Sequence, residues 1–377
     1  MARRLAFVLV SVLLVTAVVV VASGAAPEAP RNLYKLMGVL GQVVSLVRSS
    51  YVDEVSVERI ELGATTGLVE AADPGGSWVP DDHGPAFEAV RTRALPPFGL
   101  VLGKRASYPF ILQVVEGSPA AAAGLLPGQL VERIGGQPVR ARPLWRALVL
   151  LDHAERVTGE VELNVVDARF GGERKVRLAK APYALPGPSV TAHEETPVVR
   201  IPILSAAAAT AVEELLRTFA GTEAVVLDLR GTAMGSPADA MKVAAAVAGG
   251  AVELQVQRRA GANGVVRARG GERGWKVVAC VDPTTGQAAE VLALALRSRG
   301  AVLVGGETYG DTATRRPVAA DGGKVWLAEE WFSAPDGTAI LGQGIKPDEV
   351  VRGRADSDPV LQRALEIARG ARPAKAA

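Results

Sequence analysis

The chain has 377 residues, of which 49% are hydrophobic and 22% are charged, with 41 glycines and 24 prolines. This length allows two or three domains with a substantial core, and the composition is that of a globular protein and not of a disordered one. The formal net charge is only +2 and no dense basic stripe is present, which argues against a nucleic-acid-binding protein.

Metal and thiol chemistry have little support in the sequence. The histidines His83, His153 and His193 are scattered and lack metal-ligand spacing, so we expect no zinc or other metal site and no cofactor. Cys280 is the single cysteine, which excludes an intrachain disulfide. It lies inside an apolar run with no histidine nearby, which predicts a buried structural residue and not a nucleophile.

The first 30 residues predict export from the cytoplasm. Arg3 and Arg4 precede an uncharged apolar run from Leu5 to Ala22, which is long for a signal-peptide core and slightly short for a membrane span. A cleaved signal peptide and a retained membrane anchor are both compatible with this pattern. In either case the arginines favour the cytoplasmic side, so we expect a periplasmic or cell-envelope protein, with the membrane as a partner through this segment.

Residues 31–92 predict an N-terminal helical region. Apolar residues recur at helical spacing from Leu33 to Val47, and a second helix is expected from Val57 to Ala71. No candidate catalytic or ligand-binding group stands out here, so we interpret the region as a small packing unit.

Residues 95–180 predict a compact β-rich module. Ile111 to Val115 alternates as a strand, Ser118 and Pro119 begin a short helix, and Gly124 ends it. The module is completed by a turn at Gly135-Gly136-Gln137-Pro138, a helix from Pro143 to His153 and a strand from Val161 to Val166.

This order of elements resembles a PDZ domain, and we refer to residues 95–180 as the PDZ module. The resemblance is carried by Pro97-Phe98-Gly99-Leu100, by E-G-S-P-A-A-A-A-G-L and by G-G-Q-P-V. It implies that backbone N–H groups of the loop receive a peptide carboxylate while the peptide pairs as an added strand, with ligand-binding residues Phe98, Gly99, Leu100 and Val101. Gln129 departs from the aspartate usual in bacterial members. A closed module that only packs on the rest of the chain is the alternative.

After a polar, proline-rich stretch at 183–197, interpreted as a linker, apolar strands alternate with helices. The first unit has a strand from Val198 to Ile203, a helix capped by Ser205, a strand from Ala224 to Leu227 and a helix begun by Ser236-Pro237. The second has a strand from Val277 to Val281, a turn at Asp282-Pro283, a helix ended by Gly300 and a strand from Ala301 to Val304. Residues 198–355 therefore predict an α/β core with a largely parallel sheet.

The end of the chain predicts two further elements. Trp326, Leu327 and the segment from Ala334 to Gly337 indicate a late hairpin. Asp358-Pro359 begins a helix, so residues 356–377 are expected to form a C-terminal helix and tail.

The complete order of segments resembles the carboxy-terminal processing peptidases, also called tail-specific proteases. The specific segments are Y-V-D-E-V, G-A-T-T-G-L-V-E-A-A-D-P, V-V-L-D-L-R and S-A-P-D-G-T-A-I-L-G-Q-G-I-K-P-D. The resemblance implies an α/β multidomain fold in which a carboxy-terminal processing peptidase core (ClpP/crotonase-like) accompanies a PDZ domain and N-terminal helices.

That family uses a serine nucleophile in a segment of the type S-A-S-A-S-E and a lysine base in T-F-G-K-G. The lysine must be neutral and within hydrogen-bond reach of the serine. Here the first segment reads T-G-Q-A-A-E, and Glu290 matches the family's glutamate, so Gln287 stands at the nucleophile position. The second reads T-Y-G-D, one residue short, so Asp311 stands at the lysine position. The oxyanion loop D-L-R-N-N-P-G-G reads D-L-R-G-T-A-M-G from Asp228 to Gly235.

No intact catalytic set is therefore expected, because a glutamine amide is not a nucleophile and an ionised Asp311 would oppose an oxyanion. Thr285 is the nearest hydroxyl that could substitute for the serine, with Asp311 as its base, since Arg315 and Arg316 stay protonated and cannot act as bases. We predict an inactive homologue that binds protein C-termini or unfolded peptides in the cell envelope. An active serine- or threonine-type endopeptidase and a membrane-tethered spacer are the alternatives. A second copy of the chain and an active paralogue are both candidate partners.

Overall fold

The computed structural model describes residues 31–167, 171–219, 221–259, 262–333, 337, 340–352 and 358–370. The predictions for the first 30 residues, for residues 334–336 and for the C-terminal tail lie outside this range. The chain divides into two compact units, Met1–Ala64 and Thr65–Ala377, each considered by itself. Among the described residues, no helix has the length and apolar character needed to cross a membrane.

Two helices were expected in the N-terminal region, and both are present as α2 (Arg31–Ser50) and α3 (Val57–Ala72). The apolar face of α2 has little cover within its own unit: Leu40 and Val44 are half-buried, while Leu36 and Val43 are exposed. The helical periodicity was therefore sufficient to predict the helix, although not the packing of its apolar side.

The PDZ module contains one sheet in the order β2-β3-β4-β6-β7, with β5 paired to β4. Leu100 and Leu102 of β2 point into a core shared with helix α6, whereas Val101 points to the opposite side. β2 ends the sheet, so only one of its edges is paired within it. The elements of this module are η1 (Pro97–Gly99), β2 (Leu100–Arg105), β3 (Tyr108–Val114), α5 (Pro119–Ala122), β4 (Leu130–Ile134), β5 (Gln137–Pro138), α6 (Leu144–His153), the π-turn η2 (Ala154–Thr158), β6 (Glu160–Val166) and β7 (Glu173–Ala179).

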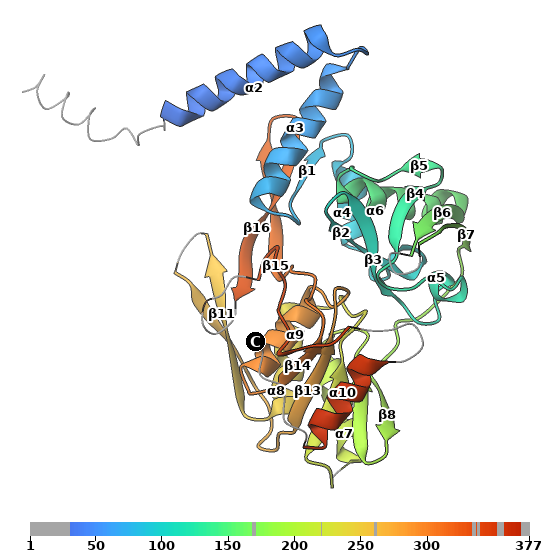
Figure 1. Cartoon of the computed structure of the whole chain (residues 1–377), viewed down its shortest axis with the longest axis vertical. Coiled ribbons are helices and arrows are strands. Elements are labelled where there is room, and N and C mark those ends of the chain that lie inside the picture. Colours follow the sequence, from blue (N-terminus) through green and yellow to red (C-terminus); the bar gives the residue numbers. More distant parts are fainter. Residues whose placement is uncertain are drawn as a thin grey trace, which may run out of the picture. The chain divides into compact units, whose positions relative to one another are not determined.

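The α/β core is built on a six-stranded sheet in the order β17-β14-β13-β10-β9-β8, parallel except for the edge strand β8 (Figure 1). Period-two alternation sorts its side chains: Val277, Ala279 and Val281 face one layer, while Val278 and Cys280 face the other. The strands are β8 (Ser189–His193), β9 (Thr196–Arg200), β10 (Ala224–Asp228), β13 (Lys276–Val281), β14 (Val302–Gly305) and β17 (Glu349–Val350).

Helices cover both faces of this sheet, as buried parallel strands require. The helices α7 (Ala208–Arg217), α8 (Pro237–Ala248) and α9 (Ala288–Arg297) contribute to the larger apolar cluster, and α10 (Pro359–Ala368) contributes to the cluster on the other face. The predicted α/β fold with a largely parallel sheet is confirmed. Cys280 is fully buried, and burial raises the pKa of its thiol to about 12, in agreement with a structural role.

A second sheet in this unit was not predicted. It joins β1 (Ser77–Pro80), β16 (Gly323–Ser333), β11 (Ala251–Arg258) and β12 (Gly264–Arg269), with β15 (Ala313–Ala320) also paired to β16 (Figure 1). β1 lies in residues 31–92, the region that we expected to be only helical. The same region also contains a third helix, the short α4 (Gly84–Arg91), which we did not predict. Four residues are too few to show a strand period by sequence, so β1 is recognisable only through its pairing with β16.

Three further expectations need correction. The stretch interpreted as a linker contains β8, which pairs antiparallel with β9 and closes one edge of the core sheet. Ser205 does not cap α7 with its side chain, because the helix begins at Ala208 after a turn. Trp326 does lie in a hairpin, but that hairpin is formed by β15 and β16, with Asp321 and Gly322 at its turn.

Candidate functional site

The turn between β13 and α9 holds Gln287 in an unusual backbone conformation, with φ 50° and ψ −117°. Positive φ is uncommon for a residue with a side chain and persists only where the surroundings impose it. Here the Gln287 N–H donates to Oε2 of Glu290 at 3.2 Å, and the Glu290 N–H donates to the Gln287 backbone carbonyl at 3.1 Å in return. This strained position is the one that the family resemblance assigns to the nucleophile. Its side chain is exposed at the N-terminus of α9.

Glu290 connects this turn to the segment from Thr308 to Asp311, where the resemblance places the lysine position. Its carboxylate is fully buried and accepts hydrogen bonds from the Thr308 hydroxyl, from the Gly310 N–H at 2.6 Å and from the Asp311 N–H at 2.8 Å. Burial raises the pKa of Glu290 to about 7, although these donors oppose the rise. The two segments identified by sequence are therefore brought together, and Glu290 is the group that holds them.

Asp311 stands at the position that the resemblance assigns to the lysine base, and it belongs to a buried ion-pair network. Arg315 donates through Nη1 to both Asp311 oxygens at 2.9 Å, and through Nε and Nη2 to Asp73 at 2.9 and 2.7 Å. Burial raises the pKa of Asp311 despite the guanidinium beside it. Burial also acts to raise the pKa of Asp73, but Arg315 and the Ala328 N–H lower it further, to below its ordinary value. Arg315 thus stays protonated between two carboxylates.

Thr285, the candidate substitute nucleophile, has other partners. Its hydroxyl donates to the Leu229 carbonyl at 3.1 Å and accepts from the Asp282 N–H at 3.1 Å, and the residue is fully buried. The carboxylate of Asp311 is bound by Arg315 and by the Ala313 N–H. The structure gives no hydrogen bond between the Thr285 hydroxyl and the Asp311 carboxylate.

The loop after β10, where the family forms its oxyanion site, is held by the PDZ module. Gln113 of β3 is 2% exposed, and its Oε1 accepts from the N–H groups of Ala233 at 2.9 Å and Met234 at 3.0 Å. Its Nε2 donates to the Pro202 carbonyl at 2.7 Å. Sequence reasoning missed Gln113, because nothing in a strand pattern shows which loop an inward-facing amide will reach. The PDZ module therefore binds the backbone donors at this edge of the core.

A polar pocket of about 410 Å³ is lined by Gln287 and Asp311, the positions of the nucleophile and the lysine in the resemblance, and by Gly235 of the loop after β10. Among the described residues that line it there is no serine, cysteine, histidine or lysine. Arg91 was not singled out from the sequence; its guanidinium lies 4.4 Å from the ring centroid of Trp326. The lining comprises Arg91, Gly235, Pro237, Gln287, Ala288, Val291 and Asp311 to Arg315.

The PDZ loop has its backbone donors already engaged. The Phe98 N–H, at φ 53°, donates to Oε1 of Glu155 at 2.6 Å. The Gly99 N–H donates to the Pro96 carbonyl, and the Leu100 N–H to that of Pro97. The side chains of Phe98 and Leu100 are buried in the module's own core.

Val101, the fourth residue expected to bind ligand, faces the α/β core and not the loop. It is half-buried against an apolar cluster that contains Phe110, Ala233 and Tyr309. The structure thus brings the four predicted residues to one end of β2, with the side chains of Phe98 and Leu100 on one side and that of Val101 on the other.

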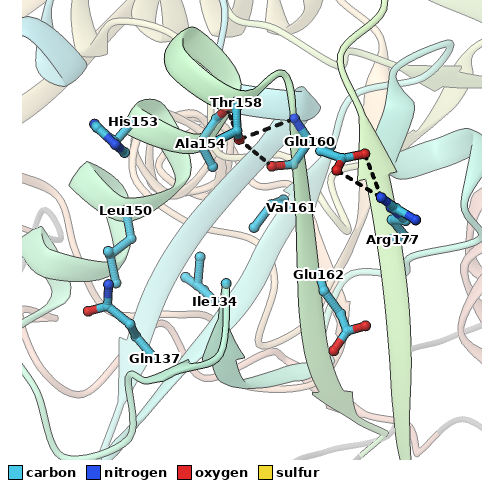
Figure 2. Close-up of a pocket in the computed structure, with 11 residues that line it drawn as sticks. Ile134, Gln137, Leu150, His153, Ala154, Thr158, Glu160, Val161, Glu162 and Arg177 are labelled. Atoms are coloured by element: carbon cyan, nitrogen blue, oxygen red, sulfur yellow. Dashed lines mark hydrogen bonds and ion pairs between the residues drawn. The ribbon is translucent and has the colours of Figure 1, made fainter.

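A second hollow of the PDZ module has a volume of about 550 Å³. Figure 2 shows it between the end of α6, with the π-turn, and strands β6 and β7. Its exposed charges are internally paired, since Arg177 donates to both oxygens of Glu160 at 2.8 Å. Glu162 of the same hollow is paired with Lys175, so each acidic and arginine side chain among the described lining residues has a partner of opposite charge. The described residues also contain no cluster of His, Cys, Asp and Glu side chains that could hold a metal ion.

Comparison with protein families and known proteins agrees with the resemblance drawn from the sequence. Residues 195–351 match peptidase family S41, and residues 110–162 match the PDZ domain. A carboxy-terminal processing protease CtpA from Bacillus subtilis (strain 168) is 24% identical over 322 residues, covering 82% of this chain and 67% of that protein. A carboxy-terminal-processing protease from Bartonella bacilliformis is 22% identical over 365 residues, covering 93% and 83%.

Among solved structures, a photosystem II D1 C-terminal processing protease superposes with a TM-score of 0.64 and 19% identity. The superposition covers 82% of this chain and 86% of the solved protease chain. This likeness establishes the fold and leaves the chemistry to be argued from the site.

Proposed function

We propose, from the premise that this chain joins a peptidase family S41 core to a PDZ domain, that it is a non-catalytic carboxy-terminal processing peptidase homologue. On this proposal it binds protein C-termini or unfolded peptides through the PDZ module, in the cell envelope. The observation that carries the proposal is Gln287: it stands at the position that the resemblance assigns to the nucleophile, on a strained backbone, and its side chain cannot attack a carbonyl carbon.

The environment of Asp311 supports the loss of catalysis. A general base must be free to take a proton, and this carboxylate is bound on both oxygens by Arg315. Arg315 also binds Asp73, so Asp311, Arg315 and Asp73 form one ion-paired network. This network occupies the position that the family gives to its lysine base. A serine mechanism needs a nucleophile and a base acting together, and neither position supplies one.

The loop at Met234 supports the same conclusion. An oxyanion site needs N–H donors that point at an empty position, whereas the Ala233 and Met234 donors are taken by Gln113. Binding of a peptide by strand addition is supported by the position of β2 at the end of its sheet. Location in the cell envelope rests on Arg3, Arg4 and the apolar run after them.

A fluorophosphonate probe and casein cleavage test the absence of activity, with Bacillus subtilis CtpA as the positive control. We expect neither labelling nor cleavage by the purified chain. Labelling that disappears in Thr285→Ala would contradict the proposal and support the alternative threonine-type peptidase. An alkaline phosphatase fusion after Pro30 tests the location: an inactive fusion recovered in the cytosol would contradict export.

A further inference from the structure

The contacts of Glu155 lead to a second proposal, which rests on the proposed binding of protein C-termini. We propose that Glu155 is a built-in occupant of the PDZ carboxylate loop, and that a peptide C-terminus binds by replacing the Glu155 carboxylate on the Phe98 N–H and on Arg93. Arg93 thereby becomes a ligand-binding residue beyond the four expected from the loop.

The geometry of Glu155 is that of a bound carboxylate. One oxygen accepts the Phe98 N–H at 2.6 Å, and the other is paired with Nη2 of Arg93. Only 4% of the residue is exposed, so it is held inside the module and not at its rim. A backbone donor and a guanidinium facing the two oxygens form a charge-assisted pair of contacts that any carboxylate can make.

Arg93 is oriented for this task by its remaining nitrogens. Its Nη1 donates to Asp152 at 2.6 Å and its Nε donates to the Leu95 carbonyl at 3.1 Å. The side chain of Arg93 is 25% exposed while that of Asp152 is 2% exposed. The guanidinium is thus anchored by Asp152 and by the Leu95 carbonyl, two contacts that do not involve Glu155, while its Nη2 is paired with Glu155.

The π-turn explains how Glu155 reaches the loop. Helix α6 ends at His153 and continues as Ala154–Thr158, where the wider winding is closed by Thr158 and by Gly159 at φ 72°. Such turns are rare and often mark functional positions, because they redirect the side chains that they carry. Figure 2 shows Ala154 and Thr158 of this turn on the hollow described above. Glu155 of the same turn is instead engaged with Arg93 and the loop.

The loop offers a ligand few other donors. The Gly99 and Leu100 N–H groups are used within the turn by the Pro96 and Pro97 carbonyls. The Phe98 N–H and Arg93 are therefore the groups that bind a carboxylate in this conformation. Because an internal carboxylate already occupies them, the apparent affinity for a peptide is reduced by the fraction of molecules in which Glu155 is engaged.

The test is a titration of the full chain with a fluorescein-labelled octapeptide ending in Leu-Ala-Ala, as the free acid and as the C-terminal amide. We expect Glu155→Ala to bind the free acid about tenfold more tightly than the wild type, with little change for the amide. Glu162→Ala is the matched control, since it removes an exposed glutamate of the same module that is paired with Lys175 and not with Arg93 or the loop, and it should leave both affinities unchanged. Glu155→Gln keeps the side-chain volume and should give a smaller gain in affinity for the free acid. This variant tests the proposal if Glu155→Ala does not fold.

The possible failures are distinguishable. Equal affinity of wild type, Glu155→Ala and Glu155→Gln for the free acid would overturn the occupancy by Glu155 and leave the proposed function standing. A folded Glu155→Ala protein that binds neither peptide would reject the proposed function, and this inference with it. Arg93→Gln added to Glu155→Gln should abolish the gain, and an unchanged affinity would remove Arg93 from the site.

Hydrogen exchange provides a readout that needs no ligand. The Phe98 amide should exchange slowly in the wild type and at least about tenfold faster in Glu155→Gln, because the acceptor is weakened. The free-acid peptide should restore its protection. Equal exchange of this amide in both proteins would contradict the proposal.

Discussion

Gln287 in the α/β core and Phe98 in the PDZ module both have a positive φ, 50° and 53°, although their ψ angles differ, −117° and 11°. Each donates its N–H to a glutamate carboxylate of the same chain, Glu290 at 3.2 Å and Glu155 at 2.6 Å. Each also stands where the family resemblance predicts function, the first at the nucleophile and the second in the carboxylate loop.

The two glutamates differ in what else binds them. Glu290 lies three residues from Gln287 in the same helix and is fully buried among donors of its own core. Glu155 lies 57 residues from Phe98 and is paired with Arg93, which a ligand carboxylate can also use. The first contact holds a turn at the position that the resemblance assigns to the nucleophile, whereas the second, on our proposal, fills a site that binds a peptide carboxylate. The same kind of backbone contact therefore does not by itself identify a functional site.

Replacing each glutamate tests this difference most strongly. We expect Glu290→Ala to lower the free energy of unfolding by about 3 kcal/mol or more, because the donors of Thr308, Gly310 and Asp311 lose a buried acceptor. Glu155→Ala should cost about half as much, since Arg93 keeps Asp152. Urea denaturation measures both, with the exposed Glu329→Ala as control. A larger cost for Glu155→Ala would reverse the comparison.

Rebuilding the catalytic pair asks whether the core site differs from an active one only in two side chains. We expect Gln287→Ser with Asp311→Lys to remain at least about a hundredfold less active on casein than Bacillus subtilis CtpA. The new lysine would face Arg315, and Gln113 would still bind the Met234 N–H. Adding Gln113→Ala should raise the activity if that contact blocks the site. Activity of the double variant equal to that of CtpA would show that the oxyanion loop is intact.

The pKa of Glu290 predicts a pH dependence of the free energy of unfolding. Its pKa of about 7 in the fold lies above the ordinary value of 4.5, so between these values the folded chain holds a proton that the unfolded chain has released. The free energy of unfolding should therefore fall as the pH rises from 4.5 to about 7, and this contribution should then stay constant. Thermal melting of the wild type and of Glu290→Gln between pH 4.5 and about 7 measures this contribution of Glu290. Parallel curves for the two proteins would contradict the assignment.

The smallest expected effect concerns the strained residue itself. Gln287→Gly should raise the free energy of unfolding by about 1 kcal/mol or less, because glycine tolerates positive φ but adds freedom to the unfolded chain. Gln287→Ala keeps a side chain at positive φ and therefore keeps the strain, so it should be the less stable of the two. Chemical denaturation separates them, and equal stability would mean that the surroundings impose no strain at this position.

Much of the fold and part of the site could be predicted from the sequence. The run Val277–Val281, the cap Ser236 and the cap Asp358 depend on neighbours a few residues away, and the structure confirms all three. The resemblance to the processing peptidases is confirmed by the family matches, and it identified two segments that Glu290 joins through hydrogen bonds. These are local patterns, and periodicity and capping chemistry are properties of local sequence.

Only the tertiary structure decided which distant groups meet. Nothing in the residues around β1 shows that Ser77 pairs with Trp326, or that a polar linker would supply β8 to the core sheet. The contacts of Gln113 with Met234 and of Glu155 with Phe98 likewise join segments far apart in the chain. A sequence pattern tells which side chains are apolar and which can donate or accept, but the partner of a buried donor is set by the packing that brings an acceptor within 3 Å or so of it.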